Sequence, residues 1–287
     1  MDAHLHRAAY DGNARDIASL VAAGADVESL DLDETPLWTA VCRGHRDVAE
    51  ALLKAGADPW RPVLGGRSAG AIALTGPLGD LFRKLPGCPE QSPDQARRQA
   101  EADALIDRYA QWNTYCGEMD GFAFIAGLDE DSAIRRLGLD PADCPVVGRN
   151  DYQEQATTNP GGELWLGRPP GAEGVAVYSA ISFDPGSSHL WGPLSSHGPV
   201  VSTATNMIVD SYIEIWRDGA MERIFQSLQE PGDDTSEEEW LCRFYDHSTH
   251  RRGLASCLAL GSLVTGVEVD EAWLFEARKR LVIPQKP

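Results

Sequence analysis

The chain of 287 residues lacks the segments that mark membrane-spanning or exported proteins. It has no run of about 18 apolar residues, so we predict no membrane helix. Its first residues, Met1 to His4, show no basic patch followed by an apolar run, and we therefore expect no signal peptide. The six cysteines are scattered without a C-x-x-C pair, which favours reduced thiols. These absences predict a cytoplasmic protein.

The common catalytic and cofactor-binding motifs are also missing. No G-x-x-x-x-G-K is followed by serine or threonine, and no G-x-G-x-x-G joins a strand to a helix, so no phosphate-binding loop is predicted. Neither G-x-S-x-G nor H-E-x-x-H occurs. We therefore predict no cofactor, name no catalytic residue, and lean against an enzyme.

Two short stretches with histidine keep an enzyme open as the alternative. His247 and His250 are candidate metal ligands, although a catalytic zinc ion takes three protein ligands. His189 and His197 flank a pair of serines, the residue types of a nucleophile and its base, without a visible third group. A hydrolase-like or metal-dependent site would need these four histidines and Asp246 to converge. A domain that binds a small ligand is a further possibility.

Acidic residues outnumber basic ones, and the excess is uneven. The net charge is −19; residues 1–90 hold 9 basic and 13 acidic side chains, and the remainder hold 16 and 31. A field of this sign repels nucleic acid and anionic lipid and favours a basic protein partner. The densest acidic run, 230–239, is stabilising by itself at the start of a predicted helix. As a contact for a basic partner it offers Asp233, Asp234 and Glu237.

The most regular stretch is 33–60, which reads D-E-T-P-L-W-T-A-V-C-R-G-H-R-D-V-A-E-A-L-L-K-A-G-A-D-P-W. A helix begins at Pro36, because the first turn does not need its missing N–H. Gly44 ends that helix, because a C-terminal turn needs a positive φ. The apolar stripe of a second helix follows at Val48, Ala49, Leu52 and Leu53. In this order of features the stretch resembles an ankyrin repeat.

Two further copies of the pattern surround it. The upstream copy lies at an offset of 32 residues and aligns Leu5, Gly12, Gly24 and Asp26 with Leu37, Gly44, Gly56 and Asp58. His6 occupies the family's histidine position, which generally braces adjacent loops, whereas Trp38 replaces it in the next copy as a packing substitute or an exposed contact. A decayed third copy begins at Ser68 and resembles a capping unit.

The resemblance implies that residues 1–85 form an ankyrin-repeat domain, which binds another protein through its loop tips and inner helix face. About three repeats are needed for a continuous core, so we expect this short stack to lean on the rest of the chain. The residues that we expect to contact a partner here are Arg7, Tyr10, Asp11, Asp31, Asp33, Glu34, Trp38, Thr39, Cys42, Arg43 and Trp60.

A proline-rich junction, 86–93, precedes an acidic domain at 94–287. Successive strands, the last two joined by Asp218-Gly219, come before helices in which Thr235 pairs with Glu238 as a capping box. Asp270 caps the last helix, whose predicted tail is Arg278-Lys279-Arg280. This order predicts an α+β domain with a mostly antiparallel sheet. Several segments resemble a bacterial domain of unknown function, which implies no activity; they are 122–138, 198–202 with 212–225, and 254–267.

We therefore predict a two-domain α+β protein that acts as a protein–protein interaction module. Its ankyrin loops and its acidic domain provide the binding surface, and the partner is another protein, not nucleic acid or a membrane. An immunity or antitoxin protein that masks a basic effector is one form of this hypothesis, because the second domain is strongly acidic.

Overall fold

The computed structural model of the chain describes residues 1–114, 121–148, 163–179, 189–205, 211–227, 232–246 and 254–284. Its internal contacts divide the chain into two compact units. Unit 1 comprises residues 1–100 and 230–252, and unit 2 comprises 101–229 and 253–287. This division differs from the predicted boundary at 86–93, because residues 230–252 belong to the first unit although they come late in the chain. No helix in the described ranges is both long and apolar enough to cross a membrane.

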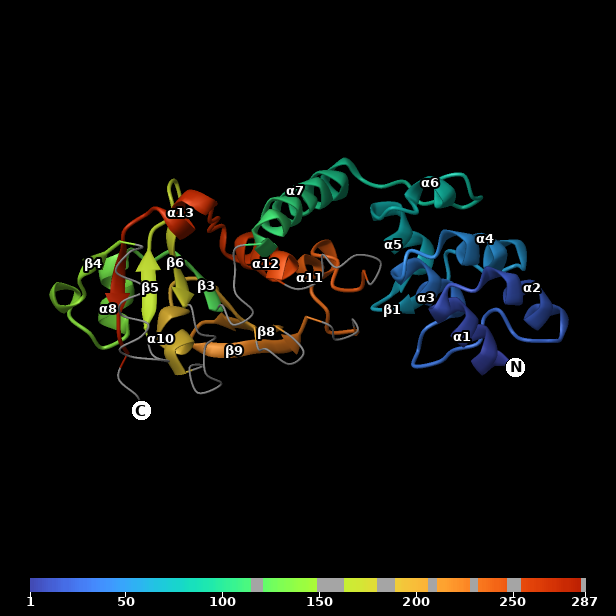
Figure 1. Ribbon diagram of the computed structural model, residues 1–287, viewed down its shortest axis with the longest axis horizontal. Coiled ribbons are helices and arrows are strands. Elements are labelled where there is room, and N and C mark those ends of the chain that lie inside the picture. The colour runs from blue at the N-terminus through green and yellow to red at the C-terminus, as the bar shows by residue number, and fades with distance from the viewer. Residues whose placement is uncertain are drawn as a thin grey trace. The chain divides into compact units, whose positions relative to one another are not determined.

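Unit 1 begins with consecutive pairs of short helices, drawn in blue to cyan in Figure 1. The pairs are α1 (Asp2–Asp11) with α2 (Ala14–Ala22), α3 (Pro36–Cys42) with α4 (Arg46–Lys54), and α5 (Ala69–Thr75) with α6 (Gly79–Phe82). A small hairpin of β1 (Pro62–Leu64) and β2 (Arg67–Ser68) precedes the third pair. One continuous core joins all three pairs, and it includes Leu5, Ile17, Leu37, Val48, Ile72 and Phe82.

The first two pairs repeat the same backbone geometry at matching positions. Gly12 and Gly44 follow the first helix of each pair with φ of 76° and 69°. Gly24 and Gly56 follow the second helix with φ of 95° and 98°. Glycine adopts such angles without the steric penalty that other residues incur. The repeat that is visible in the sequence is thus a repeat of backbone conformation.

A segment from late in the chain, 232–246, completes the core of unit 1. It contains α11 (Glu237–Leu241), and its Trp240 and Tyr245 are buried in the same cluster as the helices of the repeats. The Tyr245 hydroxyl lies 3.1 Å from the Thr75 hydroxyl at the end of α5. The short stack therefore does lean on another part of the chain, and this segment is that part.

Unit 2 contains an eight-stranded antiparallel sheet with the strand order β4-β10-β5-β6-β3-β7-β8-β9. The strands are β3 (Gly121–Ala126), β4 (Val146–Val147), β5 (Leu164–Gly167), β6 (Gly174–Ser179), β7 (Val200–Thr205), β8 (Ser211–Arg217), β9 (Ala220–Gln226) and β10 (Lys279–Val282). The hairpin turn of β8 and β9 is Asp218-Gly219, with φ of 50° and 83°. The predicted α+β class and antiparallel sheet are confirmed.

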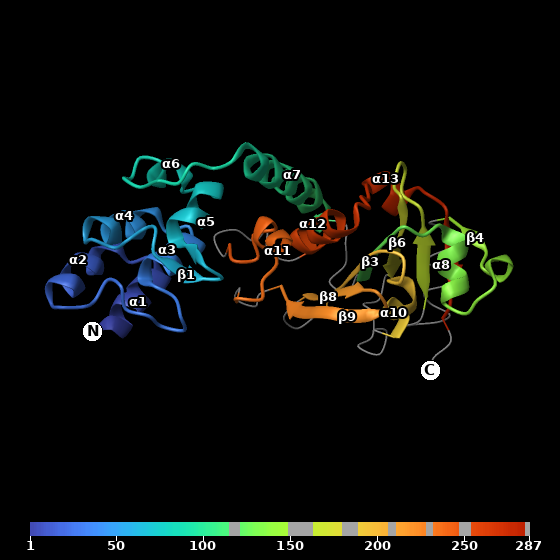
Figure 2. The same cartoon turned by 180° about the vertical axis from the view of Figure 1, so that it is seen from behind.

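Helices cover both faces of this sheet (Figures 1 and 2). On one face, α8 (Glu130–Arg136) and α10 (Trp191–Leu194) join a core that includes Ile125 of β3. On the other face α12 (Leu254–Thr265) lies so close that a Cβ on Gly261 would be 2.3 Å from the ring of Phe124. The end of α7 (Pro93–Ala110) joins this side, where the Tyr109 and Ser262 hydroxyls are 2.7 Å apart. The middle strand is consequently buried on both sides.

Helix ends differ from the sequence prediction at two places. The capping box of α11 is formed by Ser236 and Glu239, one residue later than predicted. The last helix, α13 (Glu271–Phe275), is capped by Asp270 as predicted, but it ends well before Lys279. The basic residues assigned to its tail instead begin β10, which is a strand because it pairs with β4 and β5. Such pairing leaves no mark in the local sequence.

Candidate interaction surface

Unit 1 has a concavity of about 530 Å³ formed by α1, α3 and the loop between the first two helix pairs. We call it the concave groove. Its lining residues are Ala3, His6, Arg7, Tyr10, Asp31, Leu32, Glu34, Thr39, Cys42 and Arg43. Seven of the residues that the sequence predicted as partner contacts converge here: Arg7, Tyr10, Asp31, Glu34, Thr39, Cys42 and Arg43. Thr39 and Cys42 are nearly buried and form its floor.

One wall of the groove is a tight turn at residues 30–34, which we call the finger. Asp31 and Glu34 exchange both backbone hydrogen bonds at 3.0 Å. The two residues between them, Leu32 and Asp33, have φ of 51° and 63°, as a type I′ turn requires. Neither is glycine, and each such residue costs about 1 kcal/mol. The turn leaves the Leu32 side chain 91% exposed.

The opposite wall is built on Tyr10 of α1. The guanidinium of Arg43 lies 3.3 Å from the centre of the Tyr10 ring, and that of Arg7 lies 5.6 Å from it. Arg7 also forms an ion pair with Asp11 at 2.6 Å. The backbone carbonyl of Tyr10 lies 3.1 Å from the His45 ring nitrogen Nε2, which ties α1 to the next helix pair. The aromatic ring is thereby held between two cations.

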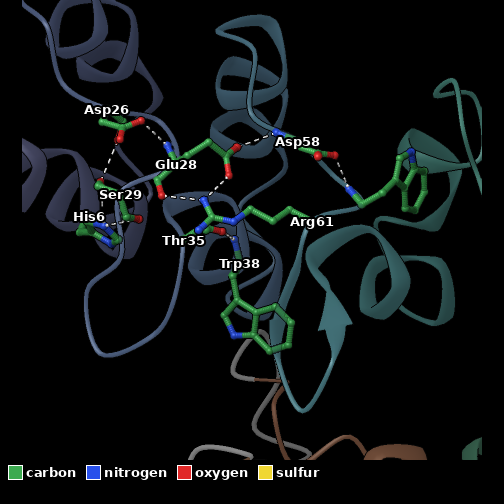
Figure 3. Close-up of polar contacts among 9 residues, drawn as sticks. His6, Asp26, Glu28, Ser29, Thr35, Trp38, Asp58 and Arg61 are labelled. Atoms are coloured by element: carbon green, nitrogen blue, oxygen red, sulfur yellow. Dashed lines mark hydrogen bonds and ion pairs between the residues drawn. The ribbon is translucent and has the colours of Figure 1, made fainter.

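Hydrogen bonds between successive loops fix the spacing of the helix pairs (Figure 3). His6 lies 3.1 Å from the carbonyl oxygen of Ser29, which agrees with the bracing expected of this histidine. The carboxylate of Glu28 accepts from the backbone N–H of Asp58 at 2.7 Å and from Arg61 at 2.9 Å. These contacts link the first loop to the second, so the finger extends from a rigid base.

The sequence prediction for Trp38 as a partner contact is wrong. Its side chain is 0% exposed, and its ring meets that of Trp240 edge-on at 6.2 Å. Figure 3 shows the indole of Trp38 pointing away from the polar contacts between the loops. Of the two roles left open for this residue, the structure selects the packing substitute. A histidine is too small to reach the same neighbour.

Trp60 is also separate from the concave groove. Its ring packs edge-on against Phe82 at 6.4 Å, and its Nε1 donates to the carbonyl oxygen of Pro86 at 2.7 Å. Trp60 thus anchors the third helix pair and the start of the junction. It is not a residue of the groove, contrary to the arrangement expected from sequence.

The acidic run is divided between internal and exposed residues. Glu237 pairs with Arg67 of the β1–β2 hairpin, and Glu238 pairs with Arg98 at 3.0 Å. Glu239 is 2% exposed and closes the capping box. Asp233 and Asp234 remain exposed. Glu237 therefore helps to hold segment 232–246 on the repeats, and the exposed part of the run remains the part that can contact a partner.

The residues of the alternative enzyme hypothesis do not assemble a nucleophile in the described ranges. His189 and His197 are both exposed, and the His197 ring contacts Arg136 at 2.9 Å. Ser195 is buried and donates to the Gly192 carbonyl at 3.0 Å, so its hydroxyl is occupied by the backbone. His247 and His250 lie outside the described residues. The described ranges contain no cluster of three or more side chains arranged to hold a metal ion.

Sequence reasoning missed two residues of this surface, Leu30 and Leu32. They alternate with acids in L-D-L-D-E, and a leucine is ordinarily assigned to a core. Their exposed fractions are 53% and 91%. The available signal was the offset of 32 residues between the first two copies, which is one residue below the usual ankyrin period. The missing residue shortens the loop, and a short loop forces a tight turn that leaves its side chains outside.

A protein-family model matches part of the chain. Residues 33–62 match the family model of the ankyrin repeat. This stretch is an ankyrin repeat. It contains α3 and α4, the floor of the groove and part of the finger. The presence of an ankyrin repeat supports the prediction that the chain is a protein–protein interaction module. No curated protein matches the chain.

Proposed function

We propose that this chain is a cytoplasmic adaptor that binds another protein through the concave groove and the finger. The observation that carries the proposal is the convergence of seven predicted contact residues on one concavity of about 530 Å³. That volume accommodates several side chains of a partner, because protein-bound small molecules occupy cavities of comparable size.

The exposed apolar residues of the finger support the same proposal. Leu32 at its tip is 91% exposed, and Tyr10 on the facing wall is 47% exposed. Burying a leucine side chain contributes about 1.5–3 kcal/mol, and tyrosine is among the residue types that most often dominate the binding energy of an interface. The strained turn holds Leu32 outward before any partner arrives, so binding requires little reordering of the loop.

The test uses a photo-reactive phenylalanine analogue placed at position 32 of the full chain in its native cells. We expect one major cross-linked protein, and we expect the same protein to be retained by the tagged wild-type chain. Leu32→Ser and Tyr10→Ala should each reduce its retention about tenfold. The matched control is Ile283→Ser, which removes another exposed apolar side chain, 46% exposed, from unit 2.

Retention that is unchanged in Leu32→Ser and Tyr10→Ala, or equal cross-linking from positions 32 and 283, would refute the groove as the binding surface. An immunity or antitoxin protein that masks a basic effector is one class of protein with these requirements. Identifying the cross-linked protein decides that narrower proposal.

A further inference from the structure

The uncompensated charge of the concave groove is negative. Asp31 and Asp33 of the finger are exposed, and in the described part of the chain neither carboxylate has a cation within ion-pair distance. Glu34 accepts from the Thr39 hydroxyl at 2.8 Å, which turns its carboxylate toward the groove floor. Asp31 and Asp33 of one short turn therefore face a partner together.

The cations of the opposite wall do not balance these acids. Arg7 is already paired with Asp11, and Arg43 is held against the face of Tyr10 at 3.3 Å. The exposed carboxylates of Asp31 and Asp33 thus keep their negative charge. The surroundings have the same sign, because unit 1 holds 14 basic and 21 acidic residues, a net charge of −7.

Apolar side chains alternate with the acids on the finger. Leu30 is 53% exposed and Leu32 is 91% exposed, on either side of Asp31. A partner that covers these leucines also desolvates the neighbouring carboxylates, and that loss is offset only when the partner brings its own cations. The two requirements select a segment in which a large apolar residue adjoins a lysine or arginine.

We infer that the partner of the concave groove is a basic segment that places a large apolar side chain and an adjacent lysine or arginine against the finger. This inference rests on the proposed function and adds the chemistry of the partner to it. An acidic segment would meet the carboxylates of Asp31 and Asp33 and is disfavoured, because like charges brought together at an interface weaken association.

The experiment selects binders of the full-length chain from a displayed library of random peptides of about twelve residues. We expect the enriched peptides to carry lysine or arginine next to leucine, isoleucine or phenylalanine. The affinity of the best peptide is then measured by fluorescence polarisation. Asp31→Lys with Asp33→Lys should weaken it about tenfold, and added salt should weaken the wild-type complex.

The matched control reverses two exposed acids of unit 1 outside the groove, Asp47→Lys with Glu90→Lys. It changes the net charge equally, and affinity should stay within about twofold of the wild type if the local carboxylates decide binding. Equal weakening by both double variants, or enriched peptides without basic residues, would overturn the inferred partner chemistry.

The variant Leu32→Ser separates this outcome from failure of the proposed function. Peptides that need Leu32 but ignore the charge at 31 and 33 leave the groove as the binding surface and refute only the basic partner. Peptides that ignore Leu32 as well, or the absence of any enriched peptide, count against both proposals.

Discussion

The rings of Trp38 and Trp240 meet edge-on, with centroids 6.2 Å apart and an angle of 87° between their planes. Trp38 lies in α3 of the ankyrin repeat, and Trp240 lies in α11 of the late segment. Edge-to-face aromatic pairs contribute about 0.5–1.5 kcal/mol beyond the area that they bury. The residue that departs from the ankyrin pattern thus packs the late segment against the repeat.

Replacing Trp38 by histidine should release segment 232–246 from the repeats of unit 1. The smaller ring loses the contact with Trp240 and leaves a void, which costs about 2–4 kcal/mol. Each 1.4 kcal/mol lost from docking raises the open population about tenfold. A glutamate-specific protease should therefore cut at residues 237–239 at least about tenfold faster in Trp38→His than in the wild type.

Trp191→His is the control for that experiment, because Trp191 is 1% exposed but belongs to the core of unit 2. It should lower stability without accelerating cleavage at 237–239. Equal cleavage rates in the wild type and Trp38→His would show that the two tryptophans do not hold the segment in place.

Arg67 should contribute more to stability than its ion-pair partner Glu237. The Arg67 guanidinium pairs with Glu237 and also lies 4.8 Å from the centre of the Trp240 ring. Both charged side chains are about one-third exposed, so the pair itself contributes only about 0.2–1 kcal/mol. The contact with the ring adds about 0.5–1 kcal/mol, which Glu237→Ala leaves intact.

A double-mutant cycle with urea denaturation measures both terms. We expect Arg67→Ala to lower the free energy of unfolding by about 0.5–1 kcal/mol more than Glu237→Ala, with a coupling energy of about 0.5 kcal/mol. Arg97 and Asp94, an exposed pair on α7, serve as the control, for which we expect almost no coupling. Equal losses in the free energy of unfolding in both single variants would show that the contact of Arg67 with the Trp240 ring does not contribute to stability.

The parts of this fold that the sequence reveals are those with local causes. Glycines at positive φ, the Thr35 cap before Pro36 and the Asp218-Gly219 turn all follow from backbone sterics within a few residues. The burial of Trp240 does not, because it depends on a surface supplied by residues far away in the chain. β10 could not be predicted for the same reason, because it is a strand only through its pairing with β4 and β5.

The candidate site was predictable to a similar extent. The repeat pattern places Tyr10 and Arg43 on one face, and the structure brings both into the groove. Exposure of Leu32 was hidden, because a leucine in a loop looks the same in sequence whether it turns inward or outward. The role of Gly70 was hidden too, since a helical glycine suggests only a weak helix.

Gly70→Ala should destabilise unit 1, although alanine is the better helix former. The helix propensity alone favours alanine by about 1 kcal/mol. A Cβ at this position would lie 2.3 Å from the Trp60 ring and 2.6 Å from the Pro59 carbonyl oxygen, which accepts from the Gly70 N–H at 2.7 Å. Overpacking of this kind costs about 1–3 kcal/mol, so we expect a net loss in the free energy of unfolding.

Ala71→Gly, at the next position of the same helix, measures the propensity term separately and should cost about 1 kcal/mol. Stabilisation by Gly70→Ala, determined by the same urea titration, would mean that Trp60 moves aside freely. The close approach of Gly70 to the loop would then not explain why this position holds glycine.

Lys279 at the start of β10 is 1% exposed and closes the C-terminal end of α13. Its Nζ donates to the carbonyl oxygens of Leu274 and Ala277 at 3.2 Å and also to that of Trp273. Burial lowers the pKa of the Lys279 ammonium from 10.5 to about 8. Between these two pKa values the unfolded chain binds more protons than the native one, so stability rises as pH increases.

The free energy of unfolding of the wild type should therefore rise relative to Lys279→Met by about 2 kcal/mol between about pH 7.5 and about pH 9.5. Burial also raises the pKa of Tyr109 and Tyr245, but this contribution cancels in the comparison because both proteins contain the two tyrosines. Lys84→Met, at an exposed lysine, should run parallel to the wild type throughout. If Lys279→Met also runs parallel, the lysine retains its ordinary pKa, and the three carbonyl oxygens must compensate its burial in full.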